Sequence, residues 1–541
     1  TIAGRQVVAL TAENINNLGG RILGADVGVA ARTDLNNIGG TIAANNNLVA
    51  TAGRDLNVTS TTRTQTNAQG SQTNIERVAG LYVTGSTGTL LASAGRDANL
   101  IAAAIQNQGS GDTTVTANNN VNLGTVTQSS SNRIVWNGNN TRSDSSRVDI
   151  GTRIQTQGDL TLQAGNDLDA KAANVTSTLG NLVAIATNNA NLTAGEANVQ
   201  VDEAHQHQGR SSAFSSKTIT TRDTLDQTTA QATTFSGKTT TVLADRDINL
   251  TGSNAVSDNG TTLAAQNNLN VAAATNTTLE GHFRDEKKSG IFSGGGLSLT
   301  IGTQQQSTDR QGVTKTAAAS TVGSTQGDIH LQAGQNYTQT GSNVIAPQGN
   351  IEIGAKRIDI VEARDTSQSQ TETKFKQSGL TVALTNPVVS AIQTADQMKS
   401  AASKTSDPRM QTLALATTAF AAKNAVDAVQ ANPSEAGGVN LSISIGTSKS
   451  QGHTTQTSNS AAGSTVAAGG NINMTASGAG QDRNITVQGS TVKAGNNIAL
   501  NAENEVKLLA AQNAAEQHST NKNSSASVGI SIGTDGLLFT A

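Results

Sequence analysis

The sequence predicts an all-β protein built as a right-handed parallel β-helix, a solenoid with about 20–22 residues per coil. Three observations predict this fold: a composition that suits a thin core, a repeat of about 21 residues, and apolar residues that alternate with polar ones inside each repeat. We also expect β-hairpins extruded from the coils to form an auxiliary sheet, and one α-helical hairpin to be inserted.

The composition is unlike that of a compact enzyme. Only 2% of the residues are aromatic, and Trp136 is the single tryptophan. A compact enzyme of this length buries many aromatic side chains, because each removes a large apolar area from water. Here the apolar residues are Ala, Val, Ile and Leu, spread among Asn, Thr, Ser and Gln. Such small side chains suit a narrow, stacked core and therefore an elongated molecule.

Charge and cysteine content restrict the classes of partner. The net charge of -3 comes without a long basic run, so counterion release gives little drive for binding nucleic acid. The absence of cysteine removes disulfide frameworks and thiolate metal sites. No stretch approaches the roughly 20 apolar residues that span a bilayer, and Thr1 begins no signal peptide. We expect an internal fragment of a longer exported chain.

The repeat is plainest at the N-terminus, where residues 14–22 recur as residues 34–42. A turn followed by a short strand then continues the pattern, as in Gly53-Arg54-Asp55-Leu56 and Gly95-Arg96-Asp97-Ala98. Apolar residues separated by 20–22 positions are expected to stack on each other: Leu243 and Leu263, Ile248 and Leu269, Leu160 and Leu182, Ile329 and Ile351, Ile485 and Val506.

One coil of this length holds three short strands and their turns. Stacking coils about 4.8 Å apart pairs every backbone N–H and C=O with the coil above or below. Asn, Asp and Gly at the turns tolerate left-handed backbone, and stacked Asn side chains are expected to form hydrogen-bonded ladders. Leucine-rich horseshoes and calcium-binding nonapeptide rolls are excluded, because their Leu-x-x-Leu-x-Leu and Gly-Gly-x-Gly-x-Asp patterns are missing.

Polar stretches interrupt the period and are interpreted as hairpins extruded from the solenoid. They are residues 59–73, 128–147, 205–237, 303–311, 366–377, 448–460 and 515–525. Several adjoin short segments of alternating apolar residues, which are the candidate envelope-engaging positions. These are Phe292, Leu297, Leu299, Ile301, Leu380, Val382, Leu384, Leu441, Ile443, Ile445, Val528, Ile530 and Ile532.

An Ala-rich region over residues 386–437 is the predicted α-helical hairpin. Val388 and Ile392 begin a helical spacing, Asp407-Pro408 offers a cap with Pro at the first helical position, and Phe420 continues a second helix. Its weak apolar stripe is expected to brace the extruded sheet, with contact to a membrane surface as the alternative.

The sequence contains only weak matches to phosphate-binding, metal-binding and catalytic motifs. Residues 235–240 end in Gly-Lys-Thr, but Ala232 stands where a phosphate loop needs its first glycine. His205 and His207 share a strand spacing that could hold a metal, although only Asp202 or Glu203 could add a ligand, so solvent-facing histidines are the favoured interpretation. Carboxylates recur at Asp245 with Asp247 and at Glu352, Asp359 and Glu362, as in β-helical polysaccharide-active enzymes. Few aromatic residues are present to stack on sugars, so we expect no catalytic, cofactor or metal site.

The repeats of this chain resemble those of filamentous haemagglutinins. Asn16 to Gly20 and Asn36 to Gly40 look like the first class of haemagglutinin repeat. Later segments resemble the second class of haemagglutinin repeat. They are residues 287–296 leading to Ile301-Gly302-Thr303, then Gly323-Ser324, Gly341-Ser342-Asn343-Val344 and Gly349-Asn350-Ile351. The resemblance covers nearly the whole chain. It implies first-class repeats over 1–58, second-class repeats over 59–385, the helical insertion over 386–437, and second-class repeats over 438–541.

Within this family the sequence is most similar to CdiA-type effectors of contact-dependent growth inhibition and related two-partner-secreted adhesins. The resemblance implies a monomeric filament that is exported through an outer-membrane β-barrel partner. It implies a stalk at the bacterial surface that meets a target-cell receptor and outer membrane and helps to pass a C-terminal toxin. The secretion domain, the Val-Glu-Asn-Asn pretoxin motif and the toxin of such effectors have no counterpart in this sequence. An adhesin segment for host glycans or other fibres and, less favoured, a polysaccharide-active enzyme stay open.

Overall fold

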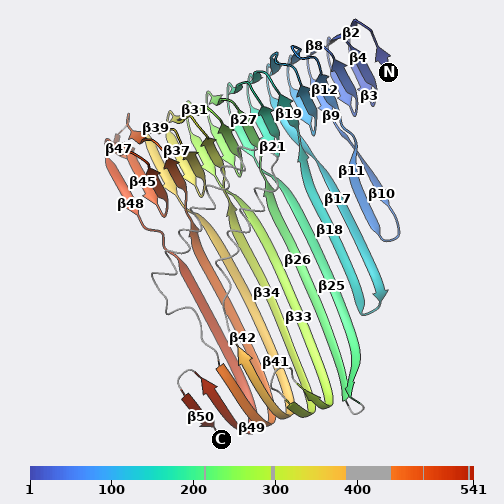
Figure 1. Cartoon of the computed structure of the whole chain (residues 1–541), viewed down its shortest axis with the longest axis vertical. Helices are drawn as coiled ribbons and strands as arrows, with labels where there is room; N and C mark the ends of the chain where they lie inside the picture. Colours follow the sequence, from blue (N-terminus) through green and yellow to red (C-terminus); the bar gives the residue numbers. More distant parts are fainter. Residues whose placement is uncertain (213–214, 294–298, 386–439, 479, 534–535, 541) are drawn as a thin grey trace.

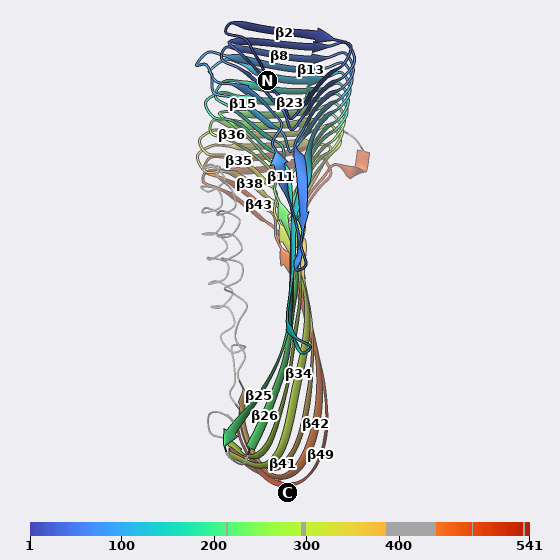
Figure 2. The same cartoon turned by 90° about the vertical axis from the view of Figure 1, so that its right-hand side faces the viewer.

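A computed structural model describes residues 1–212, 215–293, 299–385, 440–478, 480–533 and 536–540, and about three quarters of these residues belong to β-strands. Successive coils stack into a parallel solenoid, and long hairpins leave one corner of it to form a blade (Figure 1). The view at right angles shows that blade edge-on below the solenoid (Figure 2). The predicted parallel β-helix with an auxiliary sheet of extruded hairpins is therefore confirmed.

Each coil contributes one strand to each of three parallel sheets. Sheet A contains β1 (Ile2–Ala3), β4 (Arg21–Gly24), β7 (Thr41–Ala44), β12 (Gly80–Val83), β15 (Ala104–Asn107), β19 (Arg153–Thr156), β22 (Asn174–Ser177), β27 (Thr234–Gly237), β30 (Asn254–Ser257), β35 (Thr321–Ser324), β38 (Asn343–Ala346), β43 (Thr465–Ala468) and β46 (Thr491–Ala494). Sheet B contains β2 (Val7–Ala12), β5 (Asp26–Ala31), β8 (Asn47–Ala52), β13 (Thr89–Ala94), β16 (Thr113–Ala117), β20 (Leu160–Ala164), β23 (Leu182–Ala186), β28 (Thr240–Ala244), β31 (Gly260–Ala265), β36 (Asp328–Ala333), β39 (Ile351–Ala355), β44 (Ile472–Ala476) and β47 (Ile498–Ala502).

Sheet C completes each coil. It contains β3 (Ile15–Leu18), β6 (Leu35–Ile38), β9 (Leu56–Thr59), β14 (Ala98–Ile101), the first residues of β17 (Val121–Asn137), β21 (Leu168–Lys171), β24 (Ala190–Thr193), β29 (Ile248–Thr251), β32 (Leu269–Ala272), β37 (Asn336–Thr340), β40 (Arg357–Val361), β45 (Asn484–Gln488) and β48 (Glu505–Leu509). A short 3₁₀ turn, Gly480–Asp482, lies between β44 and β45. The predicted helical hairpin over 386–437 lies outside the described residues.

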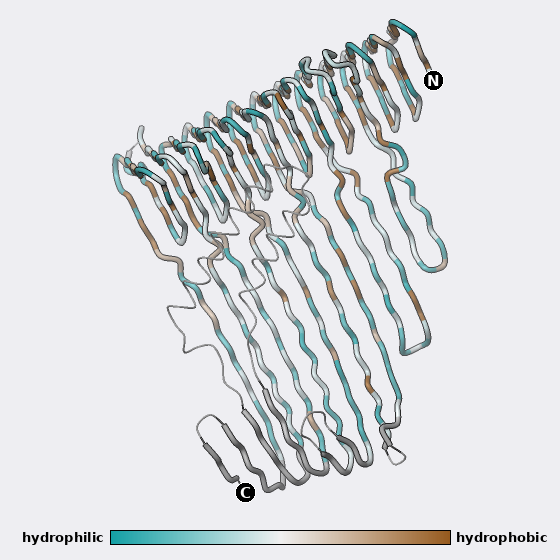
Figure 3. Tube along the Cα trace, in the orientation of Figure 1, coloured by the Kyte–Doolittle hydropathy of each residue, from teal (hydrophilic) through white to brown (hydrophobic). Residues whose placement is uncertain are grey.

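The core is a set of columns of small apolar side chains. In sheet C, Leu168 pairs with Ala190, Ala190 with Ile248, and Ile248 with Leu269, and all four are fully buried. Alternate residues of each strand point inward, which is the two-residue period that the sequence shows. Hydropathy mapped on the chain concentrates apolar residues in the solenoid and leaves the described part of the blade mainly polar (Figure 3).

The predicted coil register is right in four of five stacked pairs. Ile248 lies beside Leu269, and the same holds for Leu160 with Leu182, Ile329 with Ile351, and Ile485 with Val506. The pairing of Leu243 with Leu263 is wrong by one residue, because Val242 lies beside Leu263. That coil is one residue longer than the spacing of the two leucines suggested, and a slip of one residue moves a side chain to the other face.

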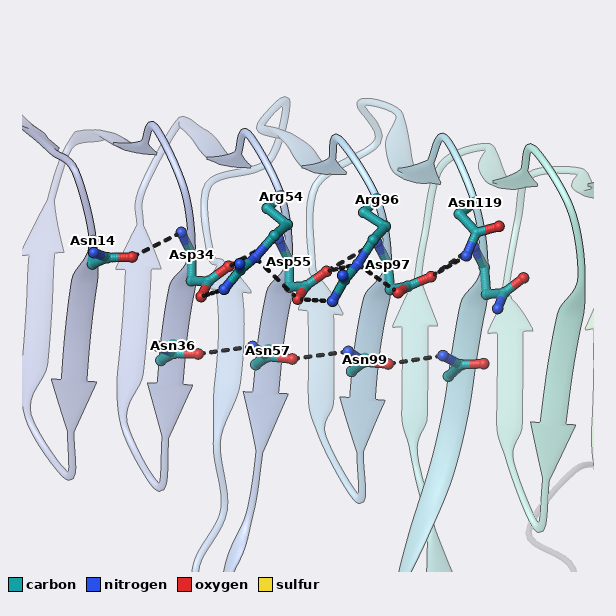
Figure 4. Close-up of polar contacts among 12 residues, drawn as sticks. Asn14, Asp34, Asn36, Arg54, Asp55, Asn57, Arg96, Asp97, Asn99 and Asn119 are labelled. Atoms are coloured by element: carbon teal, nitrogen blue, oxygen red, sulfur yellow. Dashed lines mark hydrogen bonds and ion pairs between the residues drawn. The ribbon is translucent and has the colours of Figure 1, made fainter.

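Polar ladders run along the outside of the coils, as predicted (Figure 4). Asn57 Nδ2 donates to Asn36 Oδ1 at 2.8 Å, and Asn99 Nδ2 donates to Asn57 Oδ1 at 2.9 Å. The Gly-Arg-Asp motif forms a parallel ladder, in which Arg96 Nε donates to Asp55 Oδ1 at 2.8 Å on the preceding coil. Glycine is required there because a Cβ at Gly95 would lie 2.1 Å from a backbone carbonyl oxygen.

Hairpins leave the corner between sheets C and A from every second coil, beginning after β9. They make an antiparallel extruded sheet of β10 (Thr61–Thr66), β11 (Gly70–Arg77), the rest of β17, β18 (Asn140–Gly151), β25 (Gly195–Ser212), β26 (Ser215–Gln231), β33 (Ala274–Ser293), β34 (Leu299–Ala318), β41 (Ala363–Thr385), β42 (Asn440–Ala462), β49 (Ala514–Gly533) and β50 (Gly536–Thr540). In the intervening coils, β14, β21, β29, β37 and β45 turn directly into sheet A.

The alternation has a simple geometric reason. Neighbouring strands lie about 4.8 Å apart in both sheet types, so a two-stranded hairpin is as wide as two coils are tall. One hairpin for every two coils therefore fills the blade continuously, and each hairpin pairs with the next, as β26 does with β33 and β34 with β41. The hairpins also lengthen toward the C-terminal side, which gives the blade its oblique edge (Figure 1).

Candidate functional site

The extruded sheet is the candidate site, and it is anchored to the solenoid by buried hydroxyl groups. Where the β33–β34 hairpin returns to sheet A, Ser320 Oγ donates to the Ala272 carbonyl at 2.6 Å and accepts the Ser253 N–H at 3.0 Å. Buried hydroxyls at Thr152, Thr233 and Ser464 occupy the same place in other coils. They satisfy backbone groups that lose their coil-to-coil partner where the chain departs, which a buried corner requires.

A second anchor joins each hairpin to the next at the root of the blade. Asp365 Oδ1 accepts the Ala317 N–H at 2.7 Å, and Asn276 Oδ1 accepts the Ala230 N–H at 2.8 Å. Burial raises the pKa of Asp365, and the hydrogen bond from the Ala317 N–H opposes that rise. The two anchors fix where each hairpin starts, so the solenoid sets the register of the whole blade.

Further out, the described part of the blade is polar on its surfaces and is tied together by ion pairs. Glu286 on β33 contacts Lys288 at 2.6 Å, Arg284 at 2.6 Å and Lys217 of β26 at 3.1 Å. Burial acts to raise the pKa of Glu286, but the hydrogen bonds from Lys288, Arg284 and Lys217 outweigh it and lower that pKa to about 2. This cluster holds two neighbouring hairpins together.

A hollow of about 660 Å³ opens on the blade beyond this cluster. The described residues that line it include four lysines and no carboxylate. Three of the lysines, Lys287, Lys376 and Lys449, belong to one row of cross-strand partners that runs through Gln305. Lys376 and Lys449 stand directly opposite each other on β41 and β42, an arrangement of like charges that costs free energy.

At the far end of the blade the backbone register brings the predicted apolar residues opposite one another. The rows are Leu380, Ile445 and Val528; Val382, Ile443 and Ile530; and Leu384, Leu441 and Ile532. On β33 and β34, Ile301 pairs with Ile291, Phe292 with Thr300, and Leu299 with Ser293. Leu297 lies outside the described residues. The separate apolar segments noticed in the sequence thus belong to the outermost part of one sheet.

An exposed aromatic stack lies where the shorter β17–β18 hairpin ends. Trp136 is 53% exposed, and its ring centroid lies 5.3 Å from that of His205. His205 in turn stacks on His207 at 5.9 Å, and its Nε2 lies 2.6 Å from Glu203 Oε1. Arg142 Nη1 contacts Glu203 at 3.0 Å, so a flat aromatic surface adjoins a fixed set of polar groups.

The carboxylates that the sequence singled out are held separately by their neighbours. Asp247 accepts the Asn267 side chain at 2.7 Å, and Glu352 lies 2.9 Å from His330. Asp359 pairs with Arg357, and Glu362 with Arg364. Among the residues that the structure describes, no group of three or more His, Asp or Glu could hold a metal ion. Phe235 of the Gly-Lys-Thr segment is fully buried in the solenoid core.

Sequence reasoning missed the lysine hollow, the hydroxyl anchors and the Trp136 stack. A signal for the hollow exists, since Lys287-Lys288-Ser289-Gly290-Ile291 recurs as Lys376-Gln377-Ser378-Gly379-Leu380. The hairpin limits were also misjudged. The polar stretch predicted over 205–237 belongs to a hairpin that starts at Gly195, and its last residues form β27 of the solenoid.

Comparison with known proteins agrees with the fold. The family described as Hemagglutinin repeat matches residues 214–379 and 445–540, which contain the β33–β34 and β49–β50 hairpins whole and parts of the β25–β26 and β41–β42 hairpins. The chain belongs to the haemagglutinin-repeat proteins of the filamentous haemagglutinin and CdiA type. No solved structure matches this haemagglutinin-repeat protein. Within the described residues there is no helix with the length and apolar character to cross a bilayer.

Three relatives show the extent of the similarity. Deoxyribonuclease CdiA of Yersinia pseudotuberculosis serotype O:3 (strain YPIII) is 35% identical over 260 residues, 47% of this chain and 24% of the relative. tRNA nuclease CdiA of Escherichia coli (strain NC101) is 34% identical over 272 residues, 49% of this chain and 8% of the relative. Toxin CdiA of Yersinia pestis is 34% identical over 257 residues, 47% of this chain and 8% of the relative.

The haemagglutinin-repeat chain therefore spans about a quarter or less of these relatives. The family match lies in the haemagglutinin repeats, a structural region. Together the matches support a CdiA-like stalk and indicate a secreted cell-surface filament.

Proposed function

We propose that this chain is the non-enzymatic stalk region of a secreted effector of contact-dependent growth inhibition, and that its extruded sheet engages the target-cell outer membrane during delivery of a C-terminal toxin. The proposal includes export through an outer-membrane β-barrel partner, as a monomeric filament that meets a receptor on the target cell. The names of the relatives, which denote CdiA toxins and nucleases, support this setting.

The observation that carries the proposal is the cross-strand register at the tip of the blade. Leu380, Ile445 and Val528 are partners on three adjacent strands, and the rows beyond them are also apolar. A soluble spacer has no use for contiguous apolar rows at the point farthest from its core, because such patches usually mark interaction surfaces. We also propose that the helical insertion over 386–437 braces this end of the sheet. The proposal includes first-class repeats over 1–58 and second-class repeats over 59–385 and 438–541.

The test trims one apolar tip at a cross-strand pair. Residues 290–302 are removed from the full-length protein, and Ser289 is joined to Thr303 through an Asn-Gly turn, which suits a two-residue hairpin. A matched control removes the same number of residues, 132–144, between the paired Ser131 and Ser145. Toxin entry and cell attachment are scored separately. The proposal predicts that entry falls at least tenfold only in the 290–302 variant, and unchanged entry would contradict it.

A second function, adhesion to glycans, is favoured by the Trp136 stack. An exposed tryptophan beside ordered Arg and Glu side chains offers a sugar both a flat apolar face and hydrogen-bonding groups. Binding of the isolated chain to a glycan panel, with Trp136→Ala and Trp136→Phe, tests it. Adhesion requires loss of binding in the first variant and partial retention in the second. Equal binding by all three proteins would reject it.

A further inference from the structure

We propose that the lysine hollow of the extruded sheet binds the phosphate groups of anionic lipids at a bilayer surface. The inference rests on the proposed function, because it assigns a lipid class to the same blade. It is carried by the row of Lys287, Lys376 and Lys449 that crosses three strands and lines a hollow of about 660 Å³.

The charge in this hollow is not neutralised from within. Lys287 has a carboxylate near it, Asp285, at 3.6 Å. Lys376 and Lys449 are exposed and have no ion-pair partner among the described residues, and they face each other across the β41–β42 pair. Two unpaired cations held in register create a positive potential that an anion relieves. The remaining lining groups, among them Gln305 and Ser524, can donate hydrogen bonds to oxygen.

The position of the hollow selects a membrane lipid over a free anion. Four residues beyond Lys287 and Lys376 along the same strands stand Ile291 and Leu380, where the apolar rows begin. At about 3.4 Å per residue in an antiparallel strand, the backbone of this row lies roughly 14 Å from the first apolar row, and the long lysine stems can carry the charges part of the way toward it. Lysines beside an apolar segment match a bilayer, whose phosphates lie just outside its hydrocarbon.

The hollow also differs from the other charged parts of the blade. Lys217, Arg284 and Lys288 each lie within 3.1 Å of the Glu286 carboxylate, so these three cations already share an anion. Lys374, two residues closer to the solenoid on β41 than Lys376, is paired with Glu372 at 2.8 Å. Lys376 and Lys449 therefore form a directly opposed pair of cations without a carboxylate, in the last polar rows before the apolar tip.

The test uses the whole 541-residue chain in a vesicle flotation assay. One variant carries Lys287→Gln, Lys376→Gln and Lys449→Gln. A control of equal charge change carries Lys238→Gln, Lys356→Gln and Lys507→Gln, all on the solenoid. The vesicles contain phosphatidylcholine alone or phosphatidylcholine with phosphatidylglycerol.

The parent is expected to prefer the anionic vesicles. The hollow variant should lose about 100-fold in affinity for them, since each lysine near an anionic surface contributes roughly a fivefold factor. The solenoid control should stay within about fivefold of the parent. Equal binding by the hollow variant and the parent would overturn the inference. Displacement of the anionic vesicles from the parent by inorganic phosphate alone would also overturn it, because it would indicate a small-anion site. The third contrary result is a hollow variant that no longer binds an acidic polysaccharide but still binds anionic vesicles.

The failures of the inference and of the proposed function look different. If the hollow variant floats with anionic vesicles like the parent while the 290–302 trim still blocks toxin entry, the lipid assignment alone is wrong. If the hollow variant loses vesicle binding while the trim delivers toxin normally, the lipid site stands and the role of the apolar tip in delivery is wrong.

Discussion

The solenoid and the blade use the same backbone spacing but are stabilised in different ways. In the solenoid, each coil buries small apolar side chains completely, as at Leu192 and Leu250. In the described part of the blade, polar and charged residues occupy both surfaces, and backbone pairing and ion pairs such as those of Glu286 hold the strands. A sheet without a buried apolar face is marginal by itself in water. The blade therefore depends on the solenoid for its register and its stability.

This difference also explains how a thin sheet can extend so far from its support. Every second coil supplies one hairpin, so the strand spacing of the solenoid is copied into the blade. The anchors at Ser320 and Asp365 fix the starting point of each hairpin. The outer surface is then free to carry polar and apolar residues for contact, because few of them are needed for a core.

The largest expected difference between the two regions is the response to losing a buried aromatic ring. Phe235 is fully buried in the solenoid, whereas Phe283 on β33 is only partly covered. Phe235→Ala should lower the free energy of unfolding by about 3–5 kcal/mol, and Phe283→Ala by about 1 kcal/mol or less. Urea denaturation followed by circular dichroism measures both. Similar losses in the two variants would show that the blade has a core of its own.

The next effect concerns the anchors between the two regions. Ser320→Ala leaves the Ala272 carbonyl and the Ser253 N–H without their buried partner, which should cost about 1–3 kcal/mol. Amide hydrogen exchange should also increase at the root of β33 and β34. The control is Ser458→Ala on an exposed position of β42, expected to change stability by less than about 0.5 kcal/mol. If Ser320→Ala were as stable as the control, the Ser320 hydroxyl would not stabilise the root of the hairpin.

A smaller effect separates the coils that extrude a hairpin from those that do not. Coils without a hairpin turn through one left-handed residue, which is glycine at Gly252 and Gly341 but alanine at Ala102 and Ala172, with φ of 47° and 48°. Since alanine is strained there, Ala172→Gly should raise the free energy of unfolding by up to about 1 kcal/mol. Ala170→Gly in the neighbouring strand should instead lower it by a similar amount. If both variants lost stability, the left-handed backbone at Ala172 would not be strained.

The smallest effect is the acid response of the blade. The folded pKa of Glu286 is about 2, below the ordinary value of 4.5. A lowered carboxylate pKa adds stability that is complete above the ordinary pKa and is lost as the pH falls toward the folded pKa. The difference in urea midpoint between the parent and Glu286→Gln should therefore shrink from about pH 4.5 to about pH 2. A difference that stays constant over this range would mean that the charge of Glu286 does not stabilise the blade.

The solenoid could be predicted because its signal is local and repeated. The stacking of Ile248 on Leu269 and the ladder through Asn57 follow from a fixed period and from side-chain alternation. The hairpins gave weaker signals, since polar strands with two exposed faces show no alternation from which to read their limits. Thus the predicted start of the third hairpin, His205, lies ten residues after its actual start at Gly195.

The alternation of hairpins was predictable in principle from the corners. Gly-Ser pairs such as Gly252-Ser253 and Gly341-Ser342 mark the coils that turn directly into sheet A. Their role is apparent only when the coils are aligned, because Ser342 Oγ accepts the Ser320 N–H of the preceding coil. The lysine row was harder still, since Lys376 and Lys449 are brought together by pairing across the long β41–β42 hairpin.

The most direct test of the claim that coil spacing sets the blade uses a cysteine pair in this cysteine-free chain. Gln227 and Thr278 are opposite each other on β26 and β33, and partners in a sheet lie within disulfide range. Q227C with T278C should cross-link under oxidation. Deleting the coil of residues 234–253, which extrudes no hairpin, puts two hairpins on adjacent coils and should abolish the cross-link. Deleting residues 234–320 instead keeps the alternation and places Gln227 opposite Ser367, so Q227C with S367C should cross-link. An undiminished 227–278 cross-link after the one-coil deletion would contradict the account.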